Sequence, residues 1–257
     1  ASDVYKRQHG KPLPDLTFPL FLCVHIHILL LSSLGAVPKH QIFCTSLRQD
    51  AESCPLVETQ GRVFLLDGEG GLHICYEGRS DRETVFNMTN HSYFNLAGQE
   101  HPEKAVHQVL SMPARHFCPD DAQNIPTGEE CPVADTPMDF RVPKPISRDL
   151  DADYEPLHLQ GGYDHNFEVF CNPCATLTDP ESGRSMSVYT DCPGIQLYSG
   201  NYLDQTGKGG IHYGKHSGIA LETQFYPDAL NKPQWKKPIV PAGKRYVSET
   251  VYRFSWR

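Results

Sequence analysis

Hydrophobic and polar residues alternate in short runs from Gly61 to the end of the chain, and no segment keeps a 3.6-residue apolar period over three turns. Successive side chains of a β-strand point to opposite faces of a sheet, so a period of two predicts strands. The alternation is clearest in residues 245–256, where one face would carry Tyr246, Ser248, Thr250, Tyr252, Phe254 and Trp256. Short strands joined by Pro- and Gly-rich segments are typical of sandwiches and barrels. The pattern therefore predicts an all-β fold.

Several other short runs in this part of the chain are also predicted to be strands. They are residues 62–67, 72–77, 84–89, 105–112, 166–170, 175–178, 186–190, 196–198 and 218–225. Gly68-Glu69-Gly70-Gly71 separates the first two runs, and the segment 179–183, Asp-Pro-Glu-Ser-Gly, separates two later ones. Gly, Pro and Asp favour tight turns, so both connections predict β-hairpins.

Residues 1–60 differ in composition from the rest of the chain. They carry five basic and five acidic residues, so the net charge of −8 comes wholly from residues 61–257. The apolar stretch 18–37 has the length of a membrane span, but Pro19, His25 and His27 interrupt it, and it exceeds the usual core of a signal peptide. A signal or anchor stays open as an alternative. We expect residues 1–60 to be an unrelated leader, disordered or artefactual, and residues 61–257 to form the domain.

Charge and cysteine content narrow the choice of partners. A net charge of −8 disfavours nucleic acid and an anionic membrane as partners.

The nine cysteines include one close pair, Cys171 and Cys174. A structural zinc site needs a second pair of ligands at a suitable spacing, and the sequence has none. Secreted proteins of this size tend to pair their cysteines, so irregularly spaced cysteines indicate reduced thiols and a cytoplasmic protein.

Four polar clusters could carry chemistry. Taken alone, each has an ordinary structural explanation. His91 could cap a turn, Asp164 follows two glycines as turn residues often do, and Gln196 could lie on a solvated strand face. Glu222 is more suggestive, because it lies in an apolar stretch, where a carboxylate is costly unless it has a partner. A surface ion pair would also explain it.

Taken in order, the clusters resemble one family, the aldose 1-epimerases or galactose mutarotases. The resemblance rests on NHSYFNL at 90–96, YDHNF at 163–167, PGIQ at 193–196 with SGN at 199–201, and LETQ at 221–224 with PDA at 227–229. It covers roughly Gly61 to Arg257. It implies a large antiparallel β-sandwich with an open sugar cleft on one sheet. The implied enzyme is an isomerase that interconverts the α and β anomers of hexoses such as galactose and glucose.

The resemblance also implies roles for individual residues. It makes His91 the general acid and Glu222 the general base, and it has Asp164 and Gln196 bind sugar hydroxyls. His91, Ser92, Tyr93 and Phe94 would also line the sugar site. No metal or organic cofactor is implied, and a complete protein would be a monomer. The residue types suit the reaction, because ring opening removes the proton of the anomeric hydroxyl while the ring oxygen gains one.

The chain departs from the family pattern at its N-terminal side. Complete members carry an Asn-Arg segment and a His-Gly-Gly segment whose His contacts the sugar, and neither is present. Gly70-Gly71-Leu72-His73 has these letters in the wrong order. We therefore expect a partial sandwich that keeps the acid–base pair, with its activity as a fragment left open. The alternatives are a non-catalytic carbohydrate-binding protein, which would not need both His91 and Glu222, and a defective gene product without a stable fold.

Overall fold

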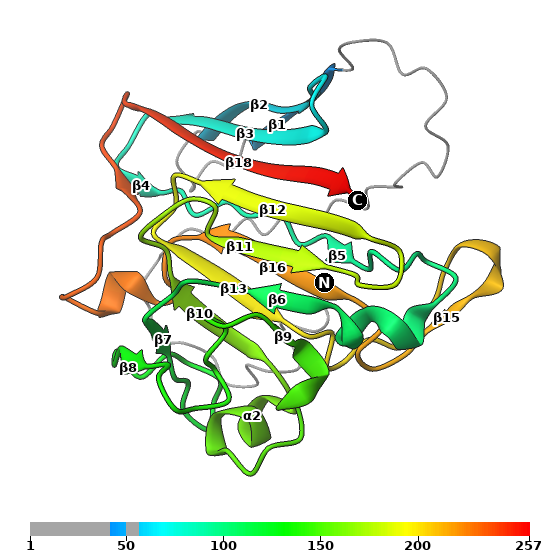
Figure 1. Ribbon diagram of the computed structural model, residues 1–257. Helices are drawn as coiled ribbons and strands as arrows, with labels where there is room; N and C mark the ends of the chain where they lie inside the picture. Colours follow the sequence, from blue (N-terminus) through cyan, green and yellow to red (C-terminus); the bar gives the residue numbers. More distant parts are fainter. Residues whose placement is uncertain (1–41, 50–56) are drawn as a thin grey trace.

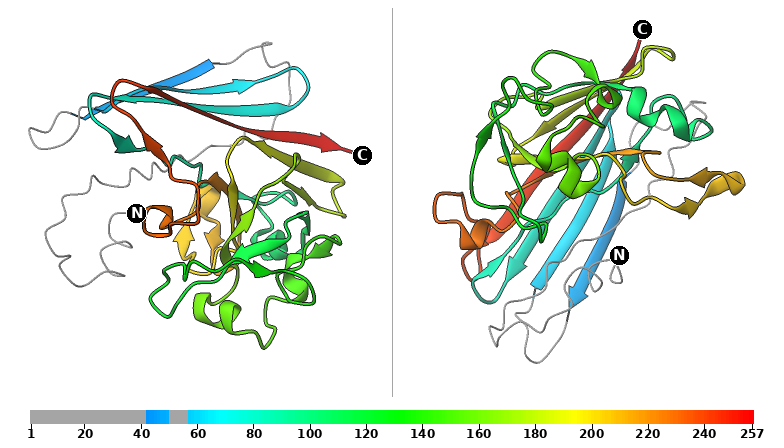
Figure 2. Two further views of the ribbon diagram at one scale, coloured as in Figure 1. Left: turned by 90° about the vertical axis from the view of Figure 1, so that its left-hand side faces the viewer. Right: turned by 90° about the horizontal axis from the view of Figure 1, so that it is seen from below.

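The computed structural model describes residues 42–49 and 57–257 and shows two antiparallel sheets packed face to face (Figure 1). The larger sheet has eight strands, in the order β1 (Ile42–Gln49), β2 (Val57–Leu66), β3 (Gly71–Ser80), β18 (Arg245–Trp256), β12 (Arg184–Thr190), β11 (Ala175–Thr178), β6 (Val109–Ser111) and β9 (Lys144–Pro145). Figure 2 shows β1 to β3 and β18 running side by side as one end of this sheet. The predicted all-β sandwich is confirmed.

The smaller sheet has six strands, in the order β5 (Tyr93–Phe94), β16 (Ile219–Gln224), β13 (Gly194–Tyr198), β10 (Asp164–Glu168), β7 (His116–Cys118) and β8 (Cys131–Pro132). Two short ribbons accompany the sheets, β4 (Thr84–Val85) with β17 (Ile239–Val240), and β14 (Gln205–Thr206) with β15 (His212–Tyr213). The helical segments are short: α2 (Glu155–Gln160), η1 (Pro102–His107), η2 (Ile146–Arg148), η3 (Lys208–Gly210) and η4 (Ala229–Asn231).

Most predicted strands match observed ones, and both predicted hairpins form. β2 pairs with β3, and β11 pairs with β12. The prediction for residues 105–112 is partly wrong, because residues 102–107 form a 3₁₀-helix and only 109–111 form a strand. The predicted strand 84–89 is shortened to two residues. The sequence pattern missed α2, whose six residues are too few to show a helical period.

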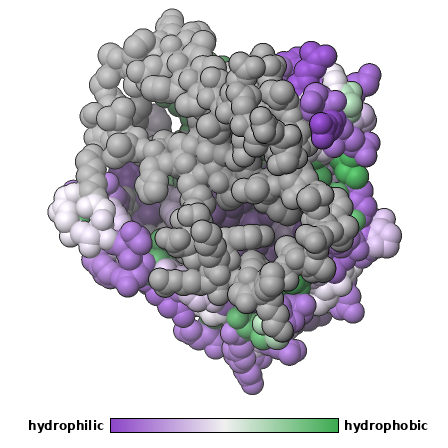
Figure 3. Space-filling model, turned by 180° about the vertical axis from the view of Figure 1, so that it is seen from behind, coloured by the Kyte–Doolittle hydropathy of each residue, from purple (hydrophilic) through white to green (hydrophobic). Residues whose placement is uncertain are grey.

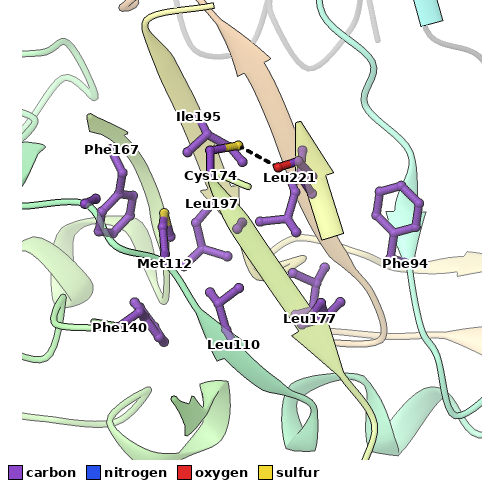
Figure 4. Packing of buried hydrophobic residues seen from close by; sticks show 14 of the residues in the cluster. Phe94, Leu110, Met112, Phe140, Phe167, Cys174, Leu177, Ile195, Leu197 and Leu221 are labelled. Carbon is purple, nitrogen blue, oxygen red and sulfur yellow. Dashed lines mark hydrogen bonds between the residues drawn. The ribbon is translucent and has the colours of Figure 1, made fainter. Parts of the chain in front are cut away.

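The core fills the space between the sheets. Inward-facing residues of both sheets form one buried cluster, which includes Leu110 and Leu177 from the larger sheet and Phe94, Ile195 and Leu221 from the smaller one (Figure 4). In the same view, the Cys174 thiol donates a hydrogen bond to the carbonyl of Val188 at 3.3 Å. The apolar side chains of the smaller sheet thus point toward the larger sheet. The opposite, outer face of the smaller sheet carries the remaining side chains of its strands.

Strand β18 shows how the alternation produces the core. Tyr246, Ser248, Thr250 and Tyr252 are buried, as the predicted face requires. Tyr252 is fully buried and donates its hydroxyl hydrogen to the carbonyl of Leu221 on the other sheet, at 2.8 Å. The face ends before Trp256, which is 73% exposed.

The predicted leader is only partly covered by the structure. Residues 42–49 form β1, which pairs with β2, and the expected boundary at residue 61 falls inside β2. The rest of the leader, including the apolar stretch 18–37, lies outside the described residues. Among the residues described, no helix has the length and apolar character needed to cross a membrane. Six cysteines are free thiols: Cys75, Cys118, Cys131, Cys171, Cys174 and Cys192.

Figure 3 shows the side of the molecule opposite to Figure 1. The described residues visible at the rim of this view are mostly hydrophilic, and the hydrophobic ones form small separate areas. Exposed large hydrophobic side chains do occur singly, including Val142, Tyr202 and Trp256. Scattered apolar side chains of this kind are normal on a folded protein.

Candidate active site

The outer face of the smaller sheet gathers the polar side chains that the sequence singled out. β13 lies between β10 and β16, and Gln196 is directly opposite both Asn166 and Glu222. The alternate residues of these strands, such as Leu197 and Leu221, face the core. Because side chains alternate along a strand, Gln196 and Glu222 must project from the outer face, and Asp164, two residues before Asn166, does so as well.

His91 completes an acid–base pair on this face. It precedes the short strand β5, in which Tyr93 pairs with Ala220 of β16. This pairing brings His91 Nε2 to 3.5 Å from Glu222 Oε1, and the two side chains are 19% and 10% exposed. The proton donor and acceptor predicted from the sequence therefore lie side by side, with little access to water.

Aromatic rings enclose the imidazole. The centroid of the His91 ring lies 5.0 Å from that of Tyr93 and 5.8 Å from that of Tyr198, the latter in an edge-to-face arrangement. Burial raises the pKa of Tyr198 to about 12 and that of Tyr93 further still. Both hydroxyls therefore stay protonated at neutral pH and can donate hydrogen bonds to a polar ligand.

Asp164 and Gln196 form a second polar pair next to the first. Gln196 Nε2 donates to Asp164 Oδ1 at 2.9 Å, and Gln224 Nε2 lies 3.5 Å from Gln196 Oε1. A carboxylate and amides at fixed positions on a sheet suit the binding of hydroxyl groups, since each hydroxyl both donates and accepts hydrogen bonds.

Burial changes the proton affinity of both carboxyls. It raises the pKa of Glu222 well above its usual value, and the negative charge of Asp164 raises it further. Burial also raises the pKa of Asp164 to about 6, although the hydrogen bond from Gln196 opposes the rise. Titratable groups with raised proton affinity that lie close together are typical of sites that transfer protons.

The remaining predicted site residues, Ser92, Tyr93 and Phe94, do not all lie on the same face of the sheet. Tyr93 is on the outer face beside His91. Ser92 donates its hydroxyl hydrogen to Asn90 Oδ1 at 3.1 Å. Phe94 is 3% exposed, and its ring packs in the core with its centroid 5.0 Å from that of Tyr252. The prediction that Phe94 contacts the sugar is therefore wrong, because neighbouring residues of one strand face opposite ways.

The sequence analysis did not include Tyr198 among the site residues. It correctly left out His73, which lies away from the site. Tyr198 could have been found from its position two residues after Gln196 in the same strand. His73 lies on the larger sheet, where its ring nitrogens are 2.9 Å from Glu249 Oε1 and 3.0 Å from Asp67 Oδ2. In the described part of the chain, no group of three or more His, Cys, Asp or Glu side chains could hold a metal ion.

Comparison with known proteins decides which family has this arrangement. The sequence profile of aldose 1-epimerases matches residues 62–253. The chain belongs to the aldose 1-epimerase family. The match begins within β2 and includes every strand of the smaller sheet, and so covers both polar pairs.

Individual relatives support the assignment. Galactose mutarotase from Homo sapiens is 42% identical over 199 residues, which cover 75% of this chain and 56% of the human protein. Aldose 1-epimerase from Haemophilus influenzae is 38% identical over 199 residues, which cover 75% of this chain and 58% of that protein. The chain thus spans little more than half the length of these relatives.

Solved structures show the same fold. Galactose 1-epimerase from Lactobacillus acidophilus superposes with a TM-score of 0.74 at 28% identity, covering 86% of this chain and 65% of that one. An aldose epimerase homologue from C. elegans gives a TM-score of 0.73 at 25% identity, covering 85% and 69%. The sandwich described above is therefore the galactose mutarotase-like fold of the family.

Proposed function

We propose that this chain is an aldose 1-epimerase that interconverts the α and β anomers of a hexose such as galactose or glucose. The observation that carries the proposal is the His91–Glu222 pair, with 3.5 Å between Nε2 and Oε1, on the same sheet face as the hydrogen-bonded pair of Asp164 and Gln196. A protein that only binds sugars has no need for a buried acid and base held side by side.

The two side chains divide the proton transfers between them. Glu222 accepts the proton of the anomeric hydroxyl while His91 donates a proton to the ring oxygen, and the C1–O5 bond breaks. The open aldehyde rotates about its C1–C2 bond, and ring closure returns both protons. Positioned acids and bases of this kind each contribute about 10²–10⁴-fold. The raised pKa of Glu222 supports this role, because a carboxylate with higher proton affinity is a stronger base.

The neighbouring groups would hold the sugar. A neutral hexose has no charged handle, so recognition depends on hydrogen bonds to its hydroxyls and on contacts with ring faces. Asp164 and Gln196 supply the hydrogen bonds, and Tyr93 and Tyr198 supply aromatic surface next to His91. We also propose that the complete protein is a monomer in the cytoplasm. Support for the location comes from six cysteines that are free thiols.

Polarimetry tests the proposal directly. The full chain should accelerate the change in optical rotation of freshly dissolved α-D-galactose or α-D-glucose. Glu222→Gln, which keeps the side-chain shape but cannot accept the proton, should lower kcat by about 10²–10⁴-fold with a smaller change in KM. Glu103→Gln, at a side chain that is 65% exposed, is the matched control and should leave kcat unchanged. Near-normal kinetics of Glu222→Gln would refute the assignment of the base. Sugar binding without any acceleration would instead identify a non-catalytic carbohydrate-binding protein.

A further inference from the structure

A third carboxyl group, that of Asp120, lies close to Asp164. Strand β7 pairs with β10 so that Cys118 is opposite Asn166. Continuing this antiparallel register by two residues places Asp120 beside Asp164. The negative charge of Asp164 acts on the Asp120 carboxyl, so the two groups lie close together. The sequence motifs did not include Asp120.

The position of Asp120 is fixed by α2. Gln160, the last residue of α2 and 2% exposed, donates from Nε2 to Asp120 Oδ2 at 2.8 Å. The carbonyl of Gln160 accepts hydrogen bonds from Asn201 Nδ2 at 2.9 Å and from the Tyr202 hydroxyl at 3.2 Å. Asn201 and Tyr202 follow β13, so the helix is tied to the strand that carries Gln196. Figure 1 shows α2 at the end of the smaller sheet near β10. This network holds one carboxyl oxygen of Asp120 and leaves the other for a different partner.

The surroundings of Asp120 favour its protonated form. Burial raises the pKa of Asp120 to about 7, and the charge of Asp164 adds to the rise, while the hydrogen bond from Gln160 opposes it. The titratable groups that face it are Asp164 from β10, Cys118 from β7 and Asp121 from its own turn. Asp164 has the lower of the two raised pKa values, at about 6. Asp120 therefore keeps its proton to a higher pH than Asp164 does.

We propose that Asp120 is a further sugar-binding residue of the cleft, and that it acts with Asp164 as a donor and acceptor pair for a hydroxyl group of the sugar. The Asp120 carboxyl donates a hydrogen bond to the hydroxyl oxygen, and the Asp164 carboxylate accepts the hydroxyl hydrogen. A hydroxyl can make both bonds at once. The hydrogen bond from Asp120 is lost when this carboxyl ionises, so sugar affinity should fall as the pH rises above neutral.

The Asn variant separates this proposal from a purely structural role. Asp120→Asn keeps an oxygen for Gln160 and has an amide that donates at every pH. In the wild type, KM for galactose should rise on the order of fivefold between pH 6.5 and 8.5, the value of one hydrogen bond. In Asp120→Asn, KM should stay flat over this range. Asp121→Asn, the same change at the next residue, should keep the wild-type rise.

Two results would overturn the proposal. One is a KM for Asp120→Asn that follows the wild-type rise with pH. The other is a wild-type KM that does not change between pH 6.5 and 8.5. A merely structural role would instead change stability or kcat in Asp120→Asn without removing the pH dependence of KM.

The inference rests on the proposed function, so a second measurement separates the two. Carboxyl ¹³C shifts of the full chain, labelled at aspartate, follow Asp120 without any turnover. Asp120 should titrate near pH 7, and Asp164→Asn should lower its pKa because a neighbouring charge is removed. Galactose affinity, measured by binding alone, should fall over the same pH range. If these hold while mutarotation is absent, the proposed function fails and the role of Asp120 stands. If mutarotation is normal but Asp120 titrates at the usual value for an aspartate, the inference fails alone.

Discussion

Replacing Asp164 with Asn should stabilise the fold at neutral pH while weakening sugar binding. Burial raises the pKa of the Asp164 carboxyl from 3.8 to about 6. Because the folded state binds this proton more tightly than the unfolded state, stability falls as the pH rises from about 4 to about 6. Above about pH 6, Asp164 is ionised and the folded protein bears the whole cost of burying its charge. Asn cannot ionise, so the variant does not lose stability in this way.

The size of the effect follows from the shift. Each pKa unit corresponds to about 1.36 kcal/mol, so ionising Asp164 in the folded protein costs at most about 3 kcal/mol. The hydrogen bond from Gln196 to the charged carboxylate is already contained in this net shift. We therefore expect Asp164→Asn to be up to about 3 kcal/mol more stable than the wild type at pH 7.5, and nearly equal in stability at pH 4.

Urea unfolding at several pH values measures this difference. The gain should grow between pH 4 and pH 6 and then level off. Asp153→Asn, at a fully exposed carboxyl, should show no such growth. The sugar dissociation constant of Asp164→Asn should rise, because a charged acceptor is lost. Our reasoning would be refuted if Asp164→Asn had the same stability as the wild type at pH 7.5, since the site would then carry no burial penalty.

Three further changes test the packing and the larger sheet. Tyr252→Phe removes the hydrogen bond to Leu221 and should lower the free energy of unfolding by about 1–2 kcal/mol; an unchanged urea midpoint would contradict the link between the sheets. Hydrogen bonds to Glu249 and Asp67 raise the pKa of His73 above 6.5. The stabilisation of the fold by the protonated His73 is therefore complete below pH 6.5 and is lost as the pH rises through the raised pKa. His73→Gln should therefore destabilise more at pH 6 than at pH 9, and equal effects at both would count against the raised pKa. Gly194→Ala would bring a methyl group to 2.5 Å from Asn166 Oδ1 and should destabilise by about 1–3 kcal/mol; a neutral effect in the same assay would show that the neighbours can move.

The sequence predicted the strands well where alternation was enough. β11 and β18 match the predicted ranges because one face of each is buried and the other is not. The error at residues 105–112 has a tertiary cause. The side chain of Gln108 accepts a hydrogen bond from the backbone of Leu96 at 2.8 Å and donates one to the carbonyl of Ala105 at 2.7 Å. These contacts close the 3₁₀-helix before β6, and no pattern within the segment reveals them.

The sequence was enough to select the residues of the candidate site, but not to show how their side chains are arranged. Residue types and motif order pointed to His91, Asp164, Gln196 and Glu222, yet the register that sets them side by side joins strands far apart in the chain. Alternation alone could have excluded Phe94 once Tyr93 was placed on the outer face.

The alternation of side chains in the smaller sheet places apolar residues in the core and polar residues on the outer face, and the two sets affect stability in opposite directions. In β13, Ile195 and Leu197 bury apolar surface in the core, while Gln196 and Tyr198 lie on the outer face of the sheet. The first pair stabilises the sheet. On the cleft face, the same neighbourhood excludes enough water to raise the pKa of Asp164 and of Glu222, and so makes their ionised forms costly. The raised proton affinity of both carboxyls comes from their burial. A substitution that lowers the cost of burying these groups therefore also removes the proton affinity on which the proposed chemistry depends. Stabilising substitutions on this face should therefore reduce activity, whereas stabilising substitutions on the core face should not.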